Sequence, residues 1–215
     1  MAQTYPARLP DAKGWSGAAG LGITAAGELT MRITAGLYGG RTLATPHDYR
    51  VRPTADKVRQ AIYNILLHND LGLSLEGARV ADLFAGTGAM GIEALSRGAA
   101  FCLFVDDSAE SRALVRQNVE ALSLTGVSKI WRRDATKLGP MAAGAGGPFG
   151  LVILDPPYHK GLIEPALVSL REGGWLSEGA VVVAETADDE TVEGAGYARV
   201  QERVYGETRV TFLHR

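Results

Sequence analysis

An aspartate, two prolines and a tyrosine, Asp155-Pro156-Pro157-Tyr158, come directly after the apolar run 151–154. Proline has no backbone N–H, so this corner offers acceptors: the Asp155 carboxylate and nearby carbonyls, that of Pro156 among them. Tyr158 adds a flat ring. Such a set suits a planar ring that carries an NH2 group, because the amine can donate to the carboxylate and a carbonyl while the ring stacks on the phenol. The alternative is an ordinary loop after a buried strand, since aspartate and proline are common loop residues.

A glycine-rich segment forms a second candidate site. Residues 80–91 contain G-x-G-x-x-G, with Gly86 and Gly88 as its first two glycines, between an expected strand and an expected helix. Glycines allow a tight turn and let a ligand approach the backbone closely. Asp106 ends the next expected strand and is placed to bind ribose hydroxyls. This spacing alone also fits a dinucleotide site.

Two further acids change the expected ligand. Asp82 stands just before the glycine turn, where a carboxylate would oppose a pyrophosphate but could accept a hydrogen bond from a ligand ammonium or, through water, serve a sulfonium-bearing amino acid. Asp134 follows the third expected strand and could bind an adenine amine. Adenine, ribose and a zwitterionic amino acid together describe S-adenosylmethionine. Helix or turn capping is the alternative for Asp106 and Asp134, but capping alone hardly explains three acids at successive strand ends.

The elements that would position these residues alternate between strand and helix from residue 79 onward. The expected strands are 79–83, 101–106, 127–132, 151–154 and 179–185, and the expected helices are about 90–97, 109–123 (capped by Ser108) and 162–171. This order predicts an α/β fold with a parallel sheet and helices on both faces. Residues 197–205 and 207–213 read as a closing antiparallel pair. Ligands of such sheets bind at the carboxyl ends of the strands.

The N-terminal part has a different pattern. Residues 1–30 are rich in alanine and glycine without periodicity, and we expect a flexible extension. Residues 31–41 alternate with glycine punctuation, as a short hairpin would. A helix is expected to follow Thr54 and reach about His68, with Arg59 facing outward, opposite its apolar stripe. We therefore divide the chain into 1–30, a hairpin and helix at 31–75, and a catalytic domain at 76–215.

Charge is distributed unevenly along the chain. Residues 31–60 carry six basic and two acidic side chains, a net charge of +4, whereas residues 61–215 carry −6. A basic segment ahead of an acidic body suggests a surface that faces a polyanion. The alternative is a solvated charged face. The candidates for phosphate contacts are Arg32, Arg41, Arg52 and Arg59.

Composition excludes several classes of protein. The chain of 215 residues is 46% hydrophobic and 21% charged, which is ordinary for a globular protein. Cys102, the single cysteine, lies in an apolar run, so a disulfide framework is excluded. The four histidines have no cysteine or second histidine at ligand spacing, and we expect no metal. No signal peptide or apolar stretch of membrane-spanning length is present, which favours the cytoplasm and no membrane partner.

With D-x-F-x-G-x-G, acids after strands two and three, and DPPY after strand four, the chain resembles the class I amino methyltransferases. More narrowly, it is similar to the bacterial enzymes that methylate N2 of a guanine in 16S rRNA, guanine(966). Residues 31–43 and 52–66 carry the narrower likeness, which extends through Gly206-Glu207-Thr208 and covers about residues 31–213.

The resemblance implies a Rossmann-like fold, mostly a parallel sheet with a terminal antiparallel hairpin, and no metal. It implies catalysis by Asp155, Pro156 and Tyr158. The cofactor S-adenosylmethionine, whose product is S-adenosylhomocysteine, would contact Asp82, Phe84, Gly86, Gly88, Asp106, Asp134 and Ala135. The partner would be 16S rRNA in a small ribosomal subunit or an assembly intermediate, and we expect a monomer.

Four other functions fit part of the pattern. A DNA adenine-N6 methyltransferase uses the same DPPY chemistry, but 215 residues leave no room for a separate target-recognition domain. A protein glutamine methyltransferase would carry asparagine at position 155. A nicotinamide-dependent oxidoreductase uses the glycine loop but gives DPPY no role. A non-catalytic RNA-binding module would keep the basic N-terminal part but needs no cofactor pocket.

Overall fold

The computed structural model describes residues 30–46, 53–68 and 71–215. Seven strands form one sheet in the order β3-β2-β1-β4-β5-β7-β6. Their bounds are β1 Arg79–Leu83, β2 Phe101–Asp106, β3 Ser128–Arg132, β4 Phe149–Leu154, β5 Leu176–Ala187, β6 Ala198–Tyr205 and β7 Thr208–His214. Strands β1 to β5 pair in parallel, and β7 pairs antiparallel with β5 and β6. The predicted parallel sheet with a closing antiparallel pair is confirmed.

The order of the strands places β1 between β2 and β4. Leu83, the last residue of β1, is in register with Val105 of β2 on one side and with Leu154 of β4 on the other. The chain therefore reverses its direction of winding at β1 and β4. In open sheets of this kind the ligand crevice lies at the carboxyl ends of the strands where the order reverses.

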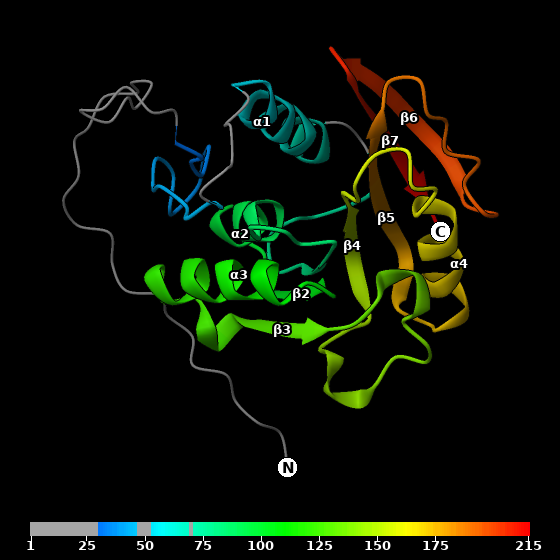
Figure 1. Ribbon diagram of the computed structural model, residues 1–215. Helices are drawn as coiled ribbons and strands as arrows, with labels where there is room; N and C mark the ends of the chain where they lie inside the picture. The colour runs from blue at the N-terminus through cyan, green and yellow to red at the C-terminus, as the bar shows by residue number, and fades with distance from the viewer. Residues whose placement is uncertain (1–29, 47–52, 69–70) are drawn as a thin grey trace.

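Helices cover both faces of the sheet (Figure 1). The helices α1 Pro53–His68, α2 Ala89–Ser96 and α3 Ala109–Ala121 lie on one side, and α4 Ile163–Glu172 lies on the other. Each side has its own buried core. Ile62 of α1 and Ile92 of α2 pack with Ile153 of β4 in one core, whereas Leu167 of α4 packs with Leu154 in the other. We call these the α1 face and the α4 face.

Most predicted elements have the expected bounds, but β5 is longer than predicted. The strand continues from Leu176 through Gly179 to Ala187. Gly179 has a φ of +69°, and the pairing of β4 with β5 shifts register between Phe149 and Leu151. From the sequence, the strand is expected to begin at Gly179. In the structure the strand continues through this glycine, which marks an irregularity inside the strand. The helix α1 begins at Pro53, which suits the first turn because its missing N–H would have no partner there.

The predicted N-terminal hairpin is present in a minimal form. Arg32 and Thr42 form a single antiparallel bridge. Hydrogen bonds from Ile33 N to Arg41 O (3.0 Å) and from Leu43 N to Met31 O (2.9 Å) close it. The side chains of Met31, Ile33 and Leu43 are buried in the same core as α1 and α2. The hairpin thus packs on the helices that cover the α1 face of the sheet.

No helix in residues 30–46, 53–68 and 71–215 is long and apolar enough to cross a membrane.

Candidate active site

The loop between β1 and α2 requires its glycines for space as well as for turning. Gly88 has a φ of +78°, and a Cβ there would lie 3.3 Å from Phe104 and Val115. A Cβ at Gly91 would lie 2.4 Å from the Phe104 ring and 2.5 Å from the Cys102 sulfur. Any larger residue would push α2 away from β2. The third glycine of the motif therefore sets how closely the helix approaches the sheet.

The structure brings Asp106 to the glycine loop. Its Oδ2 accepts the backbone N–H of Gly86 at 2.9 Å, and its Oδ1 accepts that of Ser108 at 2.9 Å. The cap of α3 is Ser108 itself, whose Oγ accepts from Ser111 N. A Cβ built on Gly86 would have only the Phe84 carbonyl oxygen within 4 Å, at 3.9 Å. The backbone of the loop is therefore open to a ligand at the point where Asp106 contacts it.

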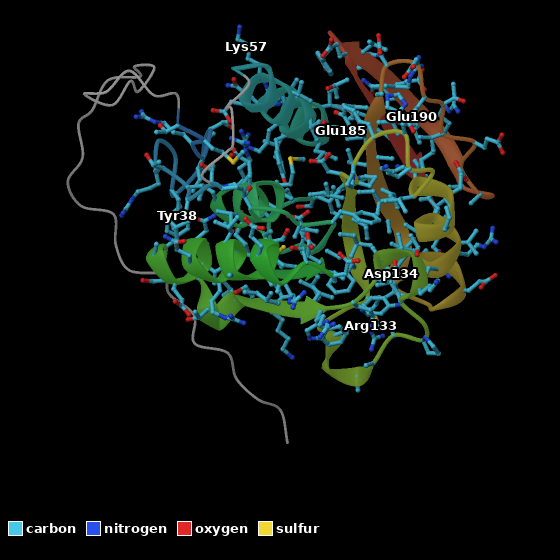
Figure 2. All side chains as sticks on the ribbon, viewed as in Figure 1. Tyr38, Lys57, Arg133, Asp134, Glu185 and Glu190 are labelled. Atoms are coloured by element: carbon cyan, nitrogen blue, oxygen red, sulfur yellow. The ribbon has the colours of Figure 1, made fainter. Side chains whose placement is uncertain are left out.

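Asp134 is an exposed residue at the end of β3, labelled in Figure 2. Its Oδ1 accepts both the backbone N–H of Thr136 (2.8 Å) and its hydroxyl (2.6 Å), which caps the 3₁₀ turn Ala135–Lys137. The hydroxyl bond of Thr136 is the main reason that the pKa of Asp134 is lowered. The capping alternative for this residue is thus realised, and contacts of Asp134 and buried Ala135 with a cofactor remain predictions.

Asp82 lies almost fully buried beneath the same loop. Its Oδ2 accepts the N–H of Gly91 at 2.8 Å. The pKa of Asp82 is raised from 3.8 to about 7, mainly by burial; the Gly91 bond opposes this rise and the Asp106 carboxylate contributes to it. A carboxyl group near its pKa at neutral pH gains most from a cationic neighbour, since that neighbour restores the charged form. A ligand ammonium, acting directly or through water, would be such a neighbour.

Asp155 follows β4 at the same edge of the sheet. Among the described residues, none donates a hydrogen bond to its carboxylate. Asp155 is exposed, yet the protein atoms gathered around the carboxylate raise its pKa, and the neighbouring carboxylates of Glu185 and Asp82 raise it further. Pro156 behind it is buried and has no N–H to offer. Within the described part of the chain, the Asp155 carboxylate therefore has no protein donor bonded to it, and its role as an acceptor for a substrate amine stays a prediction.

Tyr158 is held by two partners that the sequence did not indicate. Its hydroxyl donates to Glu185 Oε1 at 2.7 Å and lies 3.1 Å from Thr208 Oγ1. Burial and the Glu185 carboxylate raise the pKa of Tyr158, so the phenol remains protonated. The ring is half-buried, and Tyr158 follows Asp155 by three residues in the chain. Its stacking role stays a prediction, but its position is fixed by β5 and β7.

Glu185 was missed although its signal was present. It is the last residue of the strand expected at 179–185, as Asp82 and Asp106 are acids at or near the ends of their strands. Leu154 and Ala184 are in register, so Asp155 and Glu185 follow them side by side on neighbouring strands. Both should point to the α1 face, because Leu154 and Ala184 lie in the α4 core and strand side chains alternate. Figure 2 labels Glu185 beside α1.

The prediction that Arg59 faces outward is wrong. Arg59 is only 4% exposed, and its guanidinium contacts Glu93 Oε2 (3.4 Å), Asp56 Oδ1 (2.8 Å) and the carbonyl of Arg32. An amphipathic helix leaves its polar side in water when one side of it is covered. Here the hairpin covers a second side of α1, so a residue next to the apolar stripe becomes buried. The Nε and Nη2 atoms of Arg59 thus bind groups of the protein, and the side chain is not presented on the surface as a phosphate contact would require.

The other arginine candidates differ from Arg59 in exposure or lie outside the described residues. Arg41 is exposed, and Arg32 is partly exposed with its Nε bonded to Thr30 Oγ1 at 3.2 Å. Arg52 lies outside the described residues. Lys57 is exposed on α1 and points away from the rest of the protein in Figure 2. Exposed cations of the hairpin and of the outer side of α1 are therefore available on this side of the protein.

A polar contact joins the hairpin segment to the glycine loop. The side-chain amide of Asn118, buried on α3, donates to the carbonyls of Ala44 (3.1 Å) and Thr87 (2.9 Å), and its oxygen accepts from Ala44 N at 2.7 Å. Thr87 lies between the two glycines Gly86 and Gly88. The N-terminal segment and the loop are thus fixed to the same side chain, which sequence patterning does not reveal because Asn118 has no local role.

These residues fit S-adenosylmethionine as a ligand. Asp82 lies under the loop, Asp106 contacts it from the next strand, and the Gly86 backbone is open to a ligand between them. The edge therefore offers carboxylates for an ammonium and for ribose hydroxyls, and an open backbone for close approach. Asp155 follows β4, the strand next to β1, at the same edge of the sheet.

Comparisons with known proteins agree with this geometry. Residues 31–214 match the family model described as "Conserved hypothetical protein 95". The chain is 37% identical over 155 residues to "Putative rRNA methyltransferase YlbH" of Bacillus subtilis, covering 72% of this chain and 82% of that one. It is 34% identical over 157 residues to "Ribosomal RNA small subunit methyltransferase D" of Escherichia coli K12, covering 73% and 74%.

A solved structure of the "Putative methyltransferase yhhF" from Escherichia coli aligns with a TM-score of 0.70 at 29% identity, covering 86% of this chain and 98% of that one. A putative methylase from Haemophilus influenzae aligns with a TM-score of 0.67 at 25% identity, covering 86% and 98%. The match of the family model over the hairpin, the glycine loop and DPPY shows that this chain belongs to the conserved hypothetical protein 95 family, a family of class I methyltransferases.

Proposed function

We propose that the protein transfers a methyl group from S-adenosylmethionine to the exocyclic N2 of a guanine in 16S rRNA, guanine(966). The observation that carries the proposal is the Asp155 corner, an acceptor-only site at the end of β4 beside the glycine loop. The names of the relatives, which include a small-subunit rRNA methyltransferase, support RNA as the substrate.

The chemistry assigned to Asp155 follows from the weakness of the nucleophile. The lone pair of an exocyclic guanine amine is delocalised into the ring. If Asp155 and the Pro156 carbonyl accept the two amine hydrogens, the lone pair is turned out of the ring plane. The nitrogen becomes cationic as it attacks, and a fixed carboxylate stabilises that charge. S-adenosylmethionine, when bound, supplies an electrophilic methyl group.

The target base must leave its stack to reach this corner. Tyr158 is suited to receive it, because its hydroxyl is fixed by Glu185 and Thr208 and its ring cannot swing freely. Stacking of a base on an aromatic ring contributes about 1–3 kcal/mol. The tyrosine would therefore offset part of the cost of unstacking.

The basic N-terminal segment is the proposed RNA contact. Its hairpin and α1 pack on the α1 face, toward which Asp155 and Glu185 should point. RNA bound by Arg32 and Arg41 would contact the protein on the side toward which Asp155 and Glu185 should point, and Arg52, outside the described residues, is the third proposed contact. Such contacts contribute affinity and orientation rather than base identity. We further propose that the protein acts as a monomer in the cytoplasm, on a small subunit or an assembly intermediate.

The test is methyl transfer from labelled S-adenosylmethionine to small-subunit particles, naked 16S rRNA and duplex DNA, with separation of the product nucleosides. We expect N2-methylguanosine, and the better RNA substrate identifies the stage of assembly. N6-methyladenine in DNA would keep the cofactor and overturn the substrate. Transfer to none of the three would contradict the proposal.

A further inference from the structure

We propose that Glu185 is the specificity-determining residue for guanine, its carboxylate accepting the ring N1–H while Asp155 accepts the exocyclic amine. This inference rests on the proposed function, since it names how the same site would select its base. It starts from a feature that this function does not require, a second carboxylate beside the first.

The parallel pairing of β4 with β5 places the two acidic residues next to each other. Leu154 and Ala184 are paired in parallel register, and the next residues are Asp155 and Glu185. Adjacent strands lie about 4.8 Å apart. Burial and, after it, the neighbouring Glu185 carboxylate raise the pKa of Asp155, as expected for acidic residues that follow paired positions of two strands. A pair of carboxylates this close is unfavourable unless something between them supplies hydrogen-bond donors.

The described residues do not supply enough donors. Glu185 accepts from the Tyr158 hydroxyl, and Arg59 acts on it only from a distance, because the guanidinium is bonded to Glu93, Asp56 and the Arg32 carbonyl. No described residue donates to the Asp155 carboxylate. This edge of the sheet therefore holds acceptors in excess of donors, facing the side from which a base would enter.

Guanine is the base whose edge fits such a pair. A flipped base is read by hydrogen bonds to its Watson–Crick edge. Guanine presents N1–H next to its NH2 group, two adjacent donors. Adenine and cytosine present an NH2 group next to a ring nitrogen that accepts, and uracil presents one N–H between two carbonyls. A ring-nitrogen lone pair against the Glu185 carboxylate would leave two acceptors facing each other, which is costly.

The experiment replaces the target guanine in an RNA that the wild-type protein methylates by 2-aminopurine. This base keeps the reactive NH2 group but carries a lone pair at N1. The single-turnover rates for the two RNAs give a selectivity ratio. We expect the wild-type protein to prefer guanine at least tenfold, and Glu185→Gln to reduce that ratio at least tenfold, because the glutamine amide can donate to the unprotonated N1. Fluorescence of 2-aminopurine gives base entry as a readout independent of transfer.

A matched variant distinguishes two roles of Glu185, recognition of the base and support of the Tyr158 hydroxyl. Tyr158→Phe removes the hydroxyl that Glu185 accepts but leaves the carboxylate in place, so it should slow both RNAs by a similar factor and keep the ratio. If Glu185→Gln also slows both RNAs equally, Glu185 only holds the tyrosine and the inference is overturned.

A wild-type ratio near one would overturn the inference without any variant, and thus even if Glu185→Gln failed to fold. In both of these cases N2-methylguanosine would still form, and the proposed function would stand. Absence of N2-methylguanosine with the wild-type protein would instead reject the proposed function and the inference with it.

Discussion

Two groups of acidic side chains on the α1 face have opposite environments. Glu93 of α2 is fully buried and saturated with donors: it accepts from Thr34 N and Oγ1, Ala35 N, Arg59 Nε and Arg97 Nε. Asp155 and Glu185 follow paired residues of β4 and β5 at the sheet edge, and the Tyr158 hydroxyl is the one side-chain donor that the described residues give them. The same chemical group is thus satisfied in one place and left with spare acceptors in the other.

The difference indicates which carboxylates hold the protein together and which are kept for a ligand. A buried charge is tolerated when cations and N–H groups compensate it, and Glu93 has both. It fixes the hairpin to α2 and brings Arg59 inward. At the sheet edge, the Glu185 carboxylate instead raises the pKa of Asp155. Such uncompensated groups are typical of functional sites, where folding stability is lost for the sake of binding.

The largest effect on stability is expected for Glu93→Gln. Removing the charge leaves the guanidinium of Arg97 (7% exposed) without its anion and that of Arg59 (4% exposed) with Asp56 alone. We expect the free energy of unfolding to fall by roughly 3–5 kcal/mol, measured by chemical denaturation. Glu172→Gln on the exposed end of α4 is the control, with a change within about 0.5 kcal/mol. Equal effects of the two substitutions would show that the donors around Glu93 add nothing to stability.

Asp155→Ala should have the opposite effects, leaving stability unchanged or higher and greatly lowering activity. The carboxylate has no donor among the described residues, so its loss should not lower stability, and relief of repulsion with Glu185 favours folding. We expect turnover to fall by about 100-fold or more, while calorimetry shows S-adenosylmethionine binding at near wild-type affinity. Asp189→Ala, an exposed aspartate on a nearby loop, should retain activity. Near-normal turnover of Asp155→Ala would exclude it from catalysis.

The environment of Asp82 lies between those of Glu93 and Asp155. The pH dependence of folding stability measures what the burial of Asp82 costs. Its pKa is about 7 in the folded protein against 3.8 for the free group. The folded state therefore holds a proton that the unfolded state releases, and stability falls as pH rises from 3.8 to about 7, then levels off. Asp82→Asn lacks this loss.

From pH 6 to pH 8 the stability of Asp82→Asn relative to the wild type should thus rise by about 1.4 kcal/mol, measured by urea denaturation at both values. Cofactor affinity should fall in the same variant. A difference independent of pH would show that Asp82 is not held near its pKa.

The smallest effect is expected for the cations that we propose as RNA contacts. Replacing Arg41 and Arg52 together by glutamine should weaken RNA binding and flatten the dependence of log affinity on log salt, by about 0.7 for each phosphate that is no longer neutralised. Arg171 and Arg203, exposed on α4 and β6, provide a double variant of equal charge. If both double variants change the slope equally, the hairpin carries no specific RNA contact.

Much of the candidate site at the carboxyl ends of the strands could be predicted from local sequence. The ends of β1, β2 and β4 fall where apolar runs meet an acid, and the sequence placed Asp106 at the end of its strand, although not its contact with Gly86. Ser108 caps α3 as its residue type indicates. These features depend on a few neighbouring residues, whose turn, capping and strand preferences act over short distances. The cofactor and substrate contacts assigned to them remain predictions.

The partners of side chains could not be predicted in this way. The sequence alone determined the alternating α/β elements, the glycine loop and the acids at the strand ends. Only the tertiary structure decided that β1 lies beside β4, that Arg59 is turned inward to Glu93, and that Glu185 shares a corner with Asp155 and Tyr158. The reason is physical: strand order and the second covered side of α1 arise from packing between distant segments, and burial sets the charge environment of each carboxylate.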